Sequence, residues 1–236
     1  MPKGLIFAFD LETTSVESAT TTPAQICLVS EYQGVRRVLM NTLVRPGEPI
    51  QPGAEAIHGI SDEMTKSAPD YTLVAWIAHL LWQVMAPEIL LTYNGKLFDL
   101  PILDRCLGAP VFPGITHIDM LDVAYRFFPE LPSHKLGAVY AEFMKQPLDS
   151  AHNAYADVNA TLDLFRAMRV RIGMTIDQLA FEMETPKAYS VFPLGKHKGK
   201  LLRDVDRGWA IWALKSFGTM RPDLELSLRM VVDGIA

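Results

Sequence analysis

The chain has 236 residues, of which 49% are hydrophobic and 21% are charged. This composition supports a substantial buried core and excludes a disordered or low-complexity protein, and the length suits one medium domain or a domain with a small appendage. The formal net charge of −5 argues at first sight against a nucleic-acid partner, because such proteins usually carry a basic patch.

The charge is distributed unevenly along the chain. Residues 1–185 contain 13 Lys and Arg and 22 Asp and Glu, whereas residues 186–236 contain 9 and 5. An acidic body followed by a basic segment indicates two units with different roles. We therefore expect one domain over residues 1–185 and a small basic C-terminal domain over residues 186–236.

The first elements are strands. The expected elements up to residue 85 are a buried strand over 5–10, strands over 24–32 and 35–44 joined at Gln33-Gly34, a loop over 46–53 and a helix over 70–85. In that helix, Trp76, Leu80 and Val84 repeat at intervals of four and predict an internal face.

Strands and helices then alternate. The expected elements are a short strand over 88–93, a helix over 97–107, a strand and helix within 116–127, a long helix over 154–172, and a last helix over 223–232. This order is typical of an α/β domain with a mixed central sheet flanked by helices, followed by a small α-rich appendage.

No segment predicts a membrane protein or a disulfide framework. Residues 71–87 lack charges, but 17 residues are fewer than the roughly 20 that a membrane span needs. The N-terminal apolar run is too short for the core of a signal peptide. Cys27 and Cys106 lie in apolar stretches, and we expect both to be buried and reduced. We expect a cytoplasmic protein that does not contact membranes.

The first acidic motif is Asp10-x-Glu12, at the end of the first strand. Residues i and i+2 of a strand point to the same face, and two carboxylates on an apolar face are costly unless they are paired or bind a metal. The alternative is that the strand ends at Phe9 and both acids are solvated.

Two further motifs supply two acids and one histidine. Asp99 begins an otherwise apolar helix, where it could equally be a helix-start acid favoured by the macrodipole. His152 comes just before the long helix and Asp157 lies in its early turns, and taken alone this histidine could be a surface or capping residue.

Together, the four acids and the histidine indicate metal-assisted phosphodiester chemistry. Hard divalent ions such as Mg²⁺ prefer oxygen ligands, and a pair of such ions can hold a phosphodiester for attack by water. A histidine beside that site can accept the proton from the water.

At this point the chain resembles the DEDDh (DnaQ-like) family of 3′→5′ exonucleases, over about residues 4–172. The five-residue step from His152 to Asp157 resembles this group rather than its Tyr-containing relatives. The resemblance implies a ribonuclease H-like fold, two Mg²⁺ or Mn²⁺ ions bound by Asp10, Glu12, Asp99 and Asp157, and His152 as general base. It also implies hydrolysis at the 3′ ends of single-stranded or frayed duplex DNA, releasing nucleoside 5′-monophosphates.

The same resemblance implies contacts with the terminal nucleotide. His58 lies in a His-Gly-Ile segment like the one that the family places near that nucleotide. The other positions that match family contacts are Thr13, Thr14, Asn94 and Phe98.

Four positions depart from the family pattern. Ser15 stands where a Gly is frequent, Gln25 replaces a common Glu, and Gly95 replaces the Ala of the usual His-Asn-Ala, whose His is Tyr93 here. None of these departures removes a metal ligand, so they affect substrate detail and leave the expected reaction unchanged.

The C-terminal segment resembles that of exodeoxyribonuclease X-like proteins, where Phe-x-x-Gly-Lys-x-x-Gly-Lys precedes a helix with a Trp. Here the pattern runs from Phe192 to Lys200, with Trp212 in the following helix. A basic, glycine-framed turn can bind phosphates, so Lys196, Lys198 and Lys200 are candidate nucleic-acid contacts. The alternative is a solvated basic loop. We expect Trp209 and Trp212 to belong to a core.

Other functions remain open from the sequence alone. An RNA-trimming exonuclease would use the same residues, because two-ion catalysis does not depend on the sugar. A non-catalytic nucleic-acid-binding module on the same fold would be expected to have lost some of the ligands. An exonuclease of this kind could serve DNA repair, proofreading or nucleotide recycling.

Overall fold

Within residues 4–17, 19–149 and 152–235, which the computed structural model describes, five strands form one mixed sheet. The strands, in chain order, are β1 Ile6–Thr13, β2 Pro23–Tyr32, β3 Val35–Leu43, β4 Ile89–Thr92 and β5 Thr116–Asp119. Their order across the sheet is β3-β2-β1-β4-β5, with β1, β2 and β3 antiparallel and with β4 and β5 parallel to β1.

Strand β1 continues beyond the expected boundary. It pairs with β2 through Asp10 opposite Cys27 and Glu12 opposite Gln25, and it ends at Thr13. The alternative in which the strand ends at Phe9 and leaves both acids in solvent is therefore wrong. Pairing along β2 places both carboxylates within the central strand.

The helices cover both faces of the sheet and form the C-terminal part. They are α1 Pro52–His58, α2 Asp62–Thr65, α3 Tyr71–Met85, α4 Asp99–Leu107, α5 Met120–Phe127, α6 Leu136–Met144, α7 Ala154–Ile172, α8 Ile176–Glu184, α9 Arg207–Ser216 and α10 Pro222–Asp233, with short 3₁₀ turns η1 Gly195–His197 and η2 Leu202–Asp204. The sequence patterns did not predict α1, α2, α6 and α8. The loop predicted over residues 46–53 ends earlier than expected, because α1 begins at Pro52 and the first position of a helix tolerates proline.

The face of helix α3 that packs on the sheet is not the face that the sequence predicted. Trp76, Leu80 and Val84 are 50%, 52% and 79% exposed. The residues that α3 buries are smaller: Val74, Ala75 and Ala78. The prediction of an internal Trp76 face is thus wrong, because small side chains let the helix approach the sheet closely and leave the large ones outside.

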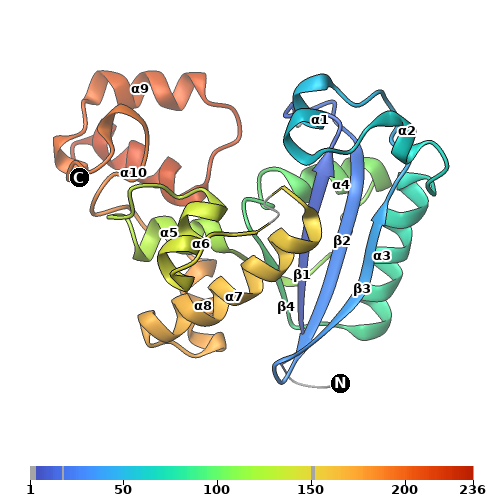
Figure 1. Cartoon of the computed structure of the whole chain (residues 1–236). Helices are drawn as coiled ribbons and strands as arrows, with labels where there is room; N and C mark the ends of the chain where they lie inside the picture. The colour runs from blue at the N-terminus through green and yellow to red at the C-terminus, as the bar shows by residue number, and fades with distance from the viewer. Residues whose placement is uncertain (1–3, 18, 150–151, 236) are drawn as a thin grey trace.

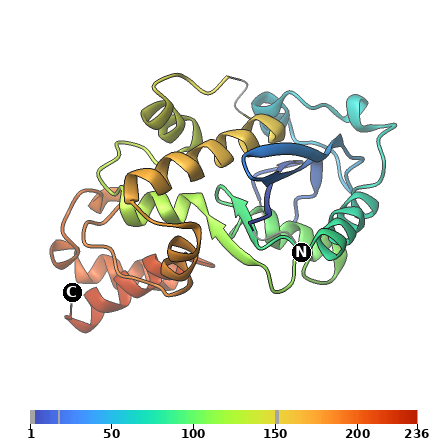
Figure 2. The ribbon, with the colours of Figure 1, turned by 90° about the horizontal axis from the view of Figure 1, so that it is seen from below.

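Alternating residues of β1 divide the core into two layers. Ile6 and Ala8 pack in the cluster that includes α5, α6 and α7, whereas Phe7 and Phe9 pack in the cluster that includes α3 and α4. The two helical layers lie on opposite sides of the sheet (Figures 1 and 2). Asp10 and Glu12 continue the series of Ile6 and Ala8, so they face the α7 side.

The C-terminal residues have an apolar cluster of their own. Its buried members include Tyr189, Phe192, Leu202, Ala210 and Leu228. Helices α9 and α10, coloured orange to red, lie beside α5 and away from β3 (Figure 1). The boundary between residues 185 and 186 remains a prediction.

The two C-terminal tryptophans differ in burial. The Trp209 ring lies edge-on to Phe192, with their ring centroids 5.5 Å apart, and it is partly buried. Trp212 is 52% exposed, so its expected place in a core is wrong. It lies on the outer surface of α9, where the small Ala210 and Ala213 face inward instead.

The described part of the chain holds no helix that is both long and apolar enough to cross a membrane. The uncharged stretch over residues 71–87, which the sequence analysis compared with a membrane span, forms α3, and this helix has 15 residues. Both cysteines are free thiols, and Cys27 is buried whereas Cys106 is partly exposed. A cytoplasmic location remains a prediction.

Candidate metal centre and active site

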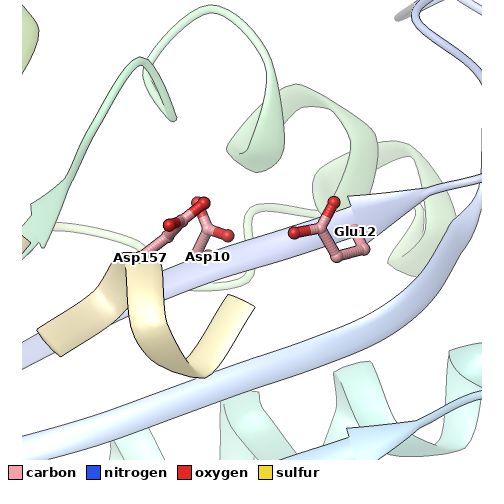
Figure 3. Close-up of side chains that lie close together, drawn as sticks. All are labelled: Asp10, Glu12 and Asp157. Atoms are coloured by element: carbon pink, nitrogen blue, oxygen red, sulfur yellow. The ribbon is translucent and has the colours of Figure 1, made fainter. Parts of the chain in front are cut away.

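Three carboxylates converge at one end of the sheet. Asp10 and Glu12 come from β1 and Asp157 from the first turns of α7, and one oxygen of each lies within 4.8 Å of the others. Asp10 and Asp157 lie side by side, with Glu12 further along β1 (Figure 3). The structure thus brings together acids that the sequence separates by almost 150 residues.

Local contacts determine where α7 begins and therefore where Asp157 lies. Asn153 is the N-cap of α7, and its side chain accepts hydrogen bonds from the backbone N–H groups of Tyr155 and Ala156 in the first turn. The side-chain oxygen of Gln25 on β2 accepts a further bond from Ala154 N, at 3.4 Å. Gln25, one of the departures from the family pattern, therefore attaches the start of α7 to the sheet.

Asp99 lies beside this cluster. It is the first residue of α4, is 4% exposed, and accepts a hydrogen bond of 3.1 Å from the backbone N–H of Leu11. Leu11 separates Asp10 from Glu12 in β1. The charge of Asp99, after burial, is the largest cause of the raised pKa of Asp10. All four expected acids thus share one electrostatic environment.

Burial and mutual repulsion disfavour the charged forms of these acids. Burial, followed by the charges of Asp99 and Asp157, holds the pKa of Asp10 well above its usual range. Burial and neighbouring charges raise the pKa of Glu12 to about 8. Burial raises the pKa of Asp99 to about 7 and that of Asp157 to about 6. Such a set of carboxylates favours a bound cation.

The donor set fits a hard divalent ion. All the ligand atoms offered are carboxylate oxygens, which Mg²⁺ and Mn²⁺ prefer. Asp157 Oδ1 is buried without any hydrogen-bond partner, and such an orphaned acceptor is costly unless something else binds it. Asp10, Glu12 and Asp157, with Asp99 beside them, are therefore the residues that would hold metal.

His152 lies at the entrance to this group. Its backbone has the left-handed conformation, with φ of 64°, and its side chain is exposed. Its charge and a backbone hydrogen bond lower the pKa of Asp157, against the larger effect of burial. His152, Asp157 and Asn94 line the same cavity of about 760 Å³. An imidazole there can reach a molecule that occupies the cavity.

His58 is held as a neutral imidazole by two backbone contacts. Its Nδ1 accepts from Ile60 N at 3.0 Å, so Nε2 carries the hydrogen and donates to the Thr13 carbonyl at 3.1 Å. Burial lowers the pKa of His58, and the charge of His152 lowers it further. The two histidines therefore face the same region, at the end of β1.

The hydroxyls of the two threonines after Glu12 are engaged within the protein. Thr13 donates to the Ser15 carbonyl at 2.8 Å, and the fully buried Thr14 donates to Glu48 at 2.6 Å. A contact in which either hydroxyl donates to a 3′ end would replace these bonds, whereas each hydroxyl oxygen can still accept a hydrogen bond. The expected contacts of Thr13 and Thr14 with substrate remain predictions.

The turn before α4 is tightly packed. The carboxylate of Asp119 accepts from Asn94 N and Lys96 N, each at 2.9 Å. A Cβ added to Gly95 would meet the Cβ of Thr92 at 2.6 Å, which explains the glycine at this departure from the family pattern. Phe98, at the start of α4, packs against the core on the α3 side, and its contact with a base remains a prediction.

Sequence reasoning missed the residues that surround this turn. Arg221, at the N-cap of α10, contacts the carboxylate of Asp122 and the side-chain oxygen of Asn94, and it lies 3.7 Å from Asp119. Nothing in the local pattern links an arginine to acids about 100 residues earlier. The one local hint of a buried cation was the pair of acids Asp119 and Asp122, three residues apart where a predicted strand leads into a predicted helix.

The three candidate lysines have different surroundings. Lys198 Nζ donates to the Pro132 carbonyl at 2.7 Å and lines the same cavity as His152. Lys196 Nζ lies 5.8 Å from the centre of the Trp209 ring, and Lys200 is exposed. The basic turn thus borders the candidate active site through Lys198.

Residues 7–165 match the family model described as RNase_T exonuclease. The match extends from β1 into α7, and it includes the four acids and His152. Among curated proteins, exodeoxyribonuclease 10 of Escherichia coli K12 is 29% identical over 197 residues, which cover 80% of this chain and 83% of the relative.

Solved exonuclease structures share the fold. Escherichia coli exonuclease I in complex with a dT13 oligonucleotide aligns with a TM-score of 0.60 at 24% identity, over 72% of this chain and 43% of that one. This chain thus spans less than half of exonuclease I. Exonuclease X in complex with 5′ overhanging duplex DNA aligns with a TM-score of 0.53 at 23% identity, over 75% of this chain and 98% of that one. The expected fold, a mixed sheet flanked by helices, is confirmed.

Proposed function

The chain belongs to the exonuclease family, in its DEDDh, DnaQ-like branch, and from that premise we propose that it removes nucleotides from the 3′ end of DNA. The observation that carries this proposal is the meeting of Asp10, Glu12 and Asp157 within 4.8 Å, at a cavity that His152 and Asp157 both line. That arrangement combines oxygen ligands for divalent ions with an exposed imidazole.

The four acids would hold two Mg²⁺ or Mn²⁺ ions. Bound ions of this kind neutralise the negative charge that develops on a phosphodiester during in-line displacement. The protein contributes a rigid frame, because Asp10 and Glu12 belong to a central strand and Asp157 to a capped helix. The Leu11 N–H orients Asp99.

His152 would act as the general base. Its imidazole would accept a proton from the water that attacks the last phosphorus atom. The bond between that phosphorus and the 3′ oxygen of the preceding nucleotide breaks. The phosphate stays on the released nucleoside 5′-monophosphate. The departing 3′ oxygen takes up a proton, which replaces the one that the water lost, so the shortened strand ends in a 3′ hydroxyl. His58, Thr13, Thr14, Asn94 and Phe98 would surround the terminal nucleotide.

DNA is the favoured substrate. The similar relative is named an exodeoxyribonuclease, and both solved structures hold DNA, one single-stranded and one with an overhang. The first alternative is an RNA-trimming exonuclease, since the chemistry is the same for both sugars. A non-catalytic binding module is the second alternative, and the complete set of acids argues against it.

Cleavage of 5′-labelled strands tests the reaction and its direction. Single-stranded DNA, duplex DNA with a 5′ overhang and single-stranded RNA are each incubated with and without Mg²⁺ or Mn²⁺. We expect metal-dependent ladders that shorten from the 3′ end, faster on DNA than on RNA. Faster cleavage of RNA would favour the first alternative, and undiminished binding without hydrolysis would favour the second.

Substitution of the site residues tests their roles. Asp10→Asn and Asp157→Asn keep the side-chain shape, remove a metal ligand, and should abolish cleavage. His152→Gln should slow it by about 10²- to 10⁴-fold, the usual contribution of a general base. Glu142→Gln, which changes an exposed acid on α6, is the matched control. Full activity of Asp10→Asn or Asp157→Asn would contradict the assignment.

A further inference from the structure

Arg221 joins the C-terminal part of the chain to the candidate active site. It is 5% exposed at the N-cap of α10, and one of its nitrogens donates to the side-chain oxygen of Asn94, 127 residues earlier. Another of its nitrogens donates to Asp122 on α5. A buried charge from α10 thus reaches the turn that precedes Asp99.

The guanidinium determines which way the Asn94 amide faces. An arginine side chain has donors and no acceptor, so Asn94 must present its oxygen to Arg221. The amide nitrogen, with its two hydrogens, is then directed away from Arg221. Asn94 is exposed and lines the cavity shared by His152 and Asp157. The donors of the amide are therefore available on the cavity side.

We propose that Arg221 is a positioning residue for this active site. By binding the Asn94 oxygen, it directs the amide N–H groups toward the cavity, where they donate to an oxygen of the substrate strand near its 3′ end. Phosphate oxygens are acceptors only, so they match such donors and would not match the carbonyl face. This inference rests on the proposed function and assigns an active-site role to the C-terminal part of the chain.

The surrounding acids keep Arg221 charged and in place. Burial acts to lower its pKa, but the nearby carboxylates of Asp119 and Asp122 raise it overall. Asp119 also accepts from the backbone of Asn94 and Lys96. The turn is therefore held by its main chain through Asp119 and by its side chain through Arg221.

A second buried arginine supplies a matched control. Arg126 on α5 donates through Nε and Nη2 to Asp223 on α10, at 2.8 and 2.6 Å. Its side chain is 8% exposed, against 6% for Arg221. Both arginines join α5 to α10, but among the described residues Arg126 makes no hydrogen bond with Asn94. Lysine at either position keeps the charge and loses the forked geometry.

The experiment compares Arg221→Lys with Arg126→Lys in the full chain. Cleavage of 5′-labelled single-stranded DNA with Mg²⁺ gives kcat and KM, and thermal melting gives stability. We expect Arg221→Lys to lower kcat/KM by about tenfold or more, the effect of losing one well-placed hydrogen bond to a charged group. Arg126→Lys should lose similar stability and keep kcat/KM within about twofold of the unaltered chain.

A double-mutant cycle with Asn94→Ala separates positioning from general stability. Asn94→Ala should lower kcat/KM as much as Arg221→Lys, and adding Arg221→Lys to it should cause no further loss of activity while still lowering the melting temperature. Asn94→Asp keeps an acceptor for Arg221 and removes both donors, so it should be as impaired as Asn94→Ala. If Arg221→Lys does not fold, the inference is tested by Asn94→Asp, because unimpaired cleavage by that variant would show that the amide donors are not needed.

Three outcomes would overturn the inference: additive losses in the cycle, an equal loss in Arg126→Lys, or unimpaired cleavage by Asn94→Asp. The unaltered chain serves as the reference in each comparison. If the unaltered chain cleaves no substrate, the proposed function is contradicted. If the unaltered chain is active but the losses caused by Arg221→Lys and Asn94→Ala are additive, only the positioning role of Arg221 is contradicted.

Discussion

Four acids that repel one another are the main electrostatic feature at the scale of single residues. Burial is the largest cause of their raised pKa values, and the charges of neighbouring acids add to it at Asp10, Glu12 and Asp99. Such an arrangement destabilises the metal-free fold, and a bound cation relieves it. The same residues therefore connect stability, pH and metal binding.

Raised pKa values predict how the metal-free protein responds to pH. Glu12, Asp99 and Asp157 have folded pKa values of about 8, 7 and 6, above the unfolded values of about 4. Folding therefore favours their protonated forms, and their contribution to stability is present below pH of about 4 and is lost as pH rises through about 6 to 8. Mg²⁺ should raise the melting temperature more at pH 8 than at pH 5, roughly the two ends of that window.

Thermal melting of the unaltered chain with EDTA or Mg²⁺, at both pH values, measures this difference. Asp157→Asn is the control: it should be more stable than the unaltered chain at the higher pH with EDTA, and it should gain less from Mg²⁺. An equal Mg²⁺ effect at both pH values would contradict the prediction.

At the scale of elements, each acid is positioned by the element that carries it. Strand β1 holds Asp10 and Glu12 because its pairing with β2 continues to Thr13. Helix α7 holds Asp157 because its first N–H groups are capped by Asn153. The turn before α4 is held by close packing at Gly95, which has no room for a larger residue.

Gly95→Ala tests that packing. The added Cβ would meet Thr92, whose side chain is fully buried at the end of β4, so the turn or the strand must shift. Overpacking of this kind costs about 1–3 kcal/mol of unfolding free energy. Because the turn leads into Asp99, cleavage should slow as well.

Gly137→Ala on α6 is the matched control, since an added Cβ there meets nothing within 4 Å. Alanine in a helix should leave stability unchanged or raise it by up to about 1 kcal/mol. Urea unfolding measures both variants, and equal free energies for the two would refute the packing argument.

At the scale of the whole molecule, the distribution of charge matters more than its sum. The acidic body contains the proposed metal ligands, and the basic turn near Lys198 borders the cavity that Asp157 lines. The net charge of −5, which first argued against a nucleic-acid partner, therefore says little about the partner.

Lys196→Glu combined with Lys198→Glu tests the basic turn. If both lysines contact phosphates, binding of single-stranded DNA weakens and the slope of log K against log salt falls by roughly 0.7 for each lost contact. Fluorescence anisotropy with Ca²⁺ in place of Mg²⁺ measures the slope without cleavage. Lys66→Glu with Lys145→Glu gives the same change of net charge on other surfaces, and an equal effect there would show that the turn has no special role.

Local patterns predicted the elements that carry the chemistry. Strand β1, helix α3 and helix α7 follow from apolar spacing and from cap residues within a few positions of each boundary. The motifs around Asp10, Asp99 and Asp157 stand out in the sequence because their acids interrupt apolar runs. Residues close together in the chain encode these features, so the sequence alone was sufficient to predict that these elements exist and where the acidic motifs lie in them.

Tertiary structure decided what depends on distant contacts. The exposed face of α3, the placement of Trp212 and the meeting of Arg221 with Asn94 each depend on how separate elements pack. Helical spacing shows that a face is apolar, but only the packed sheet determines that small residues such as Ala75 and Ala78 face inward. A hydrogen bond between residues 127 positions apart forms because the fold brings them together, and no local pattern records it.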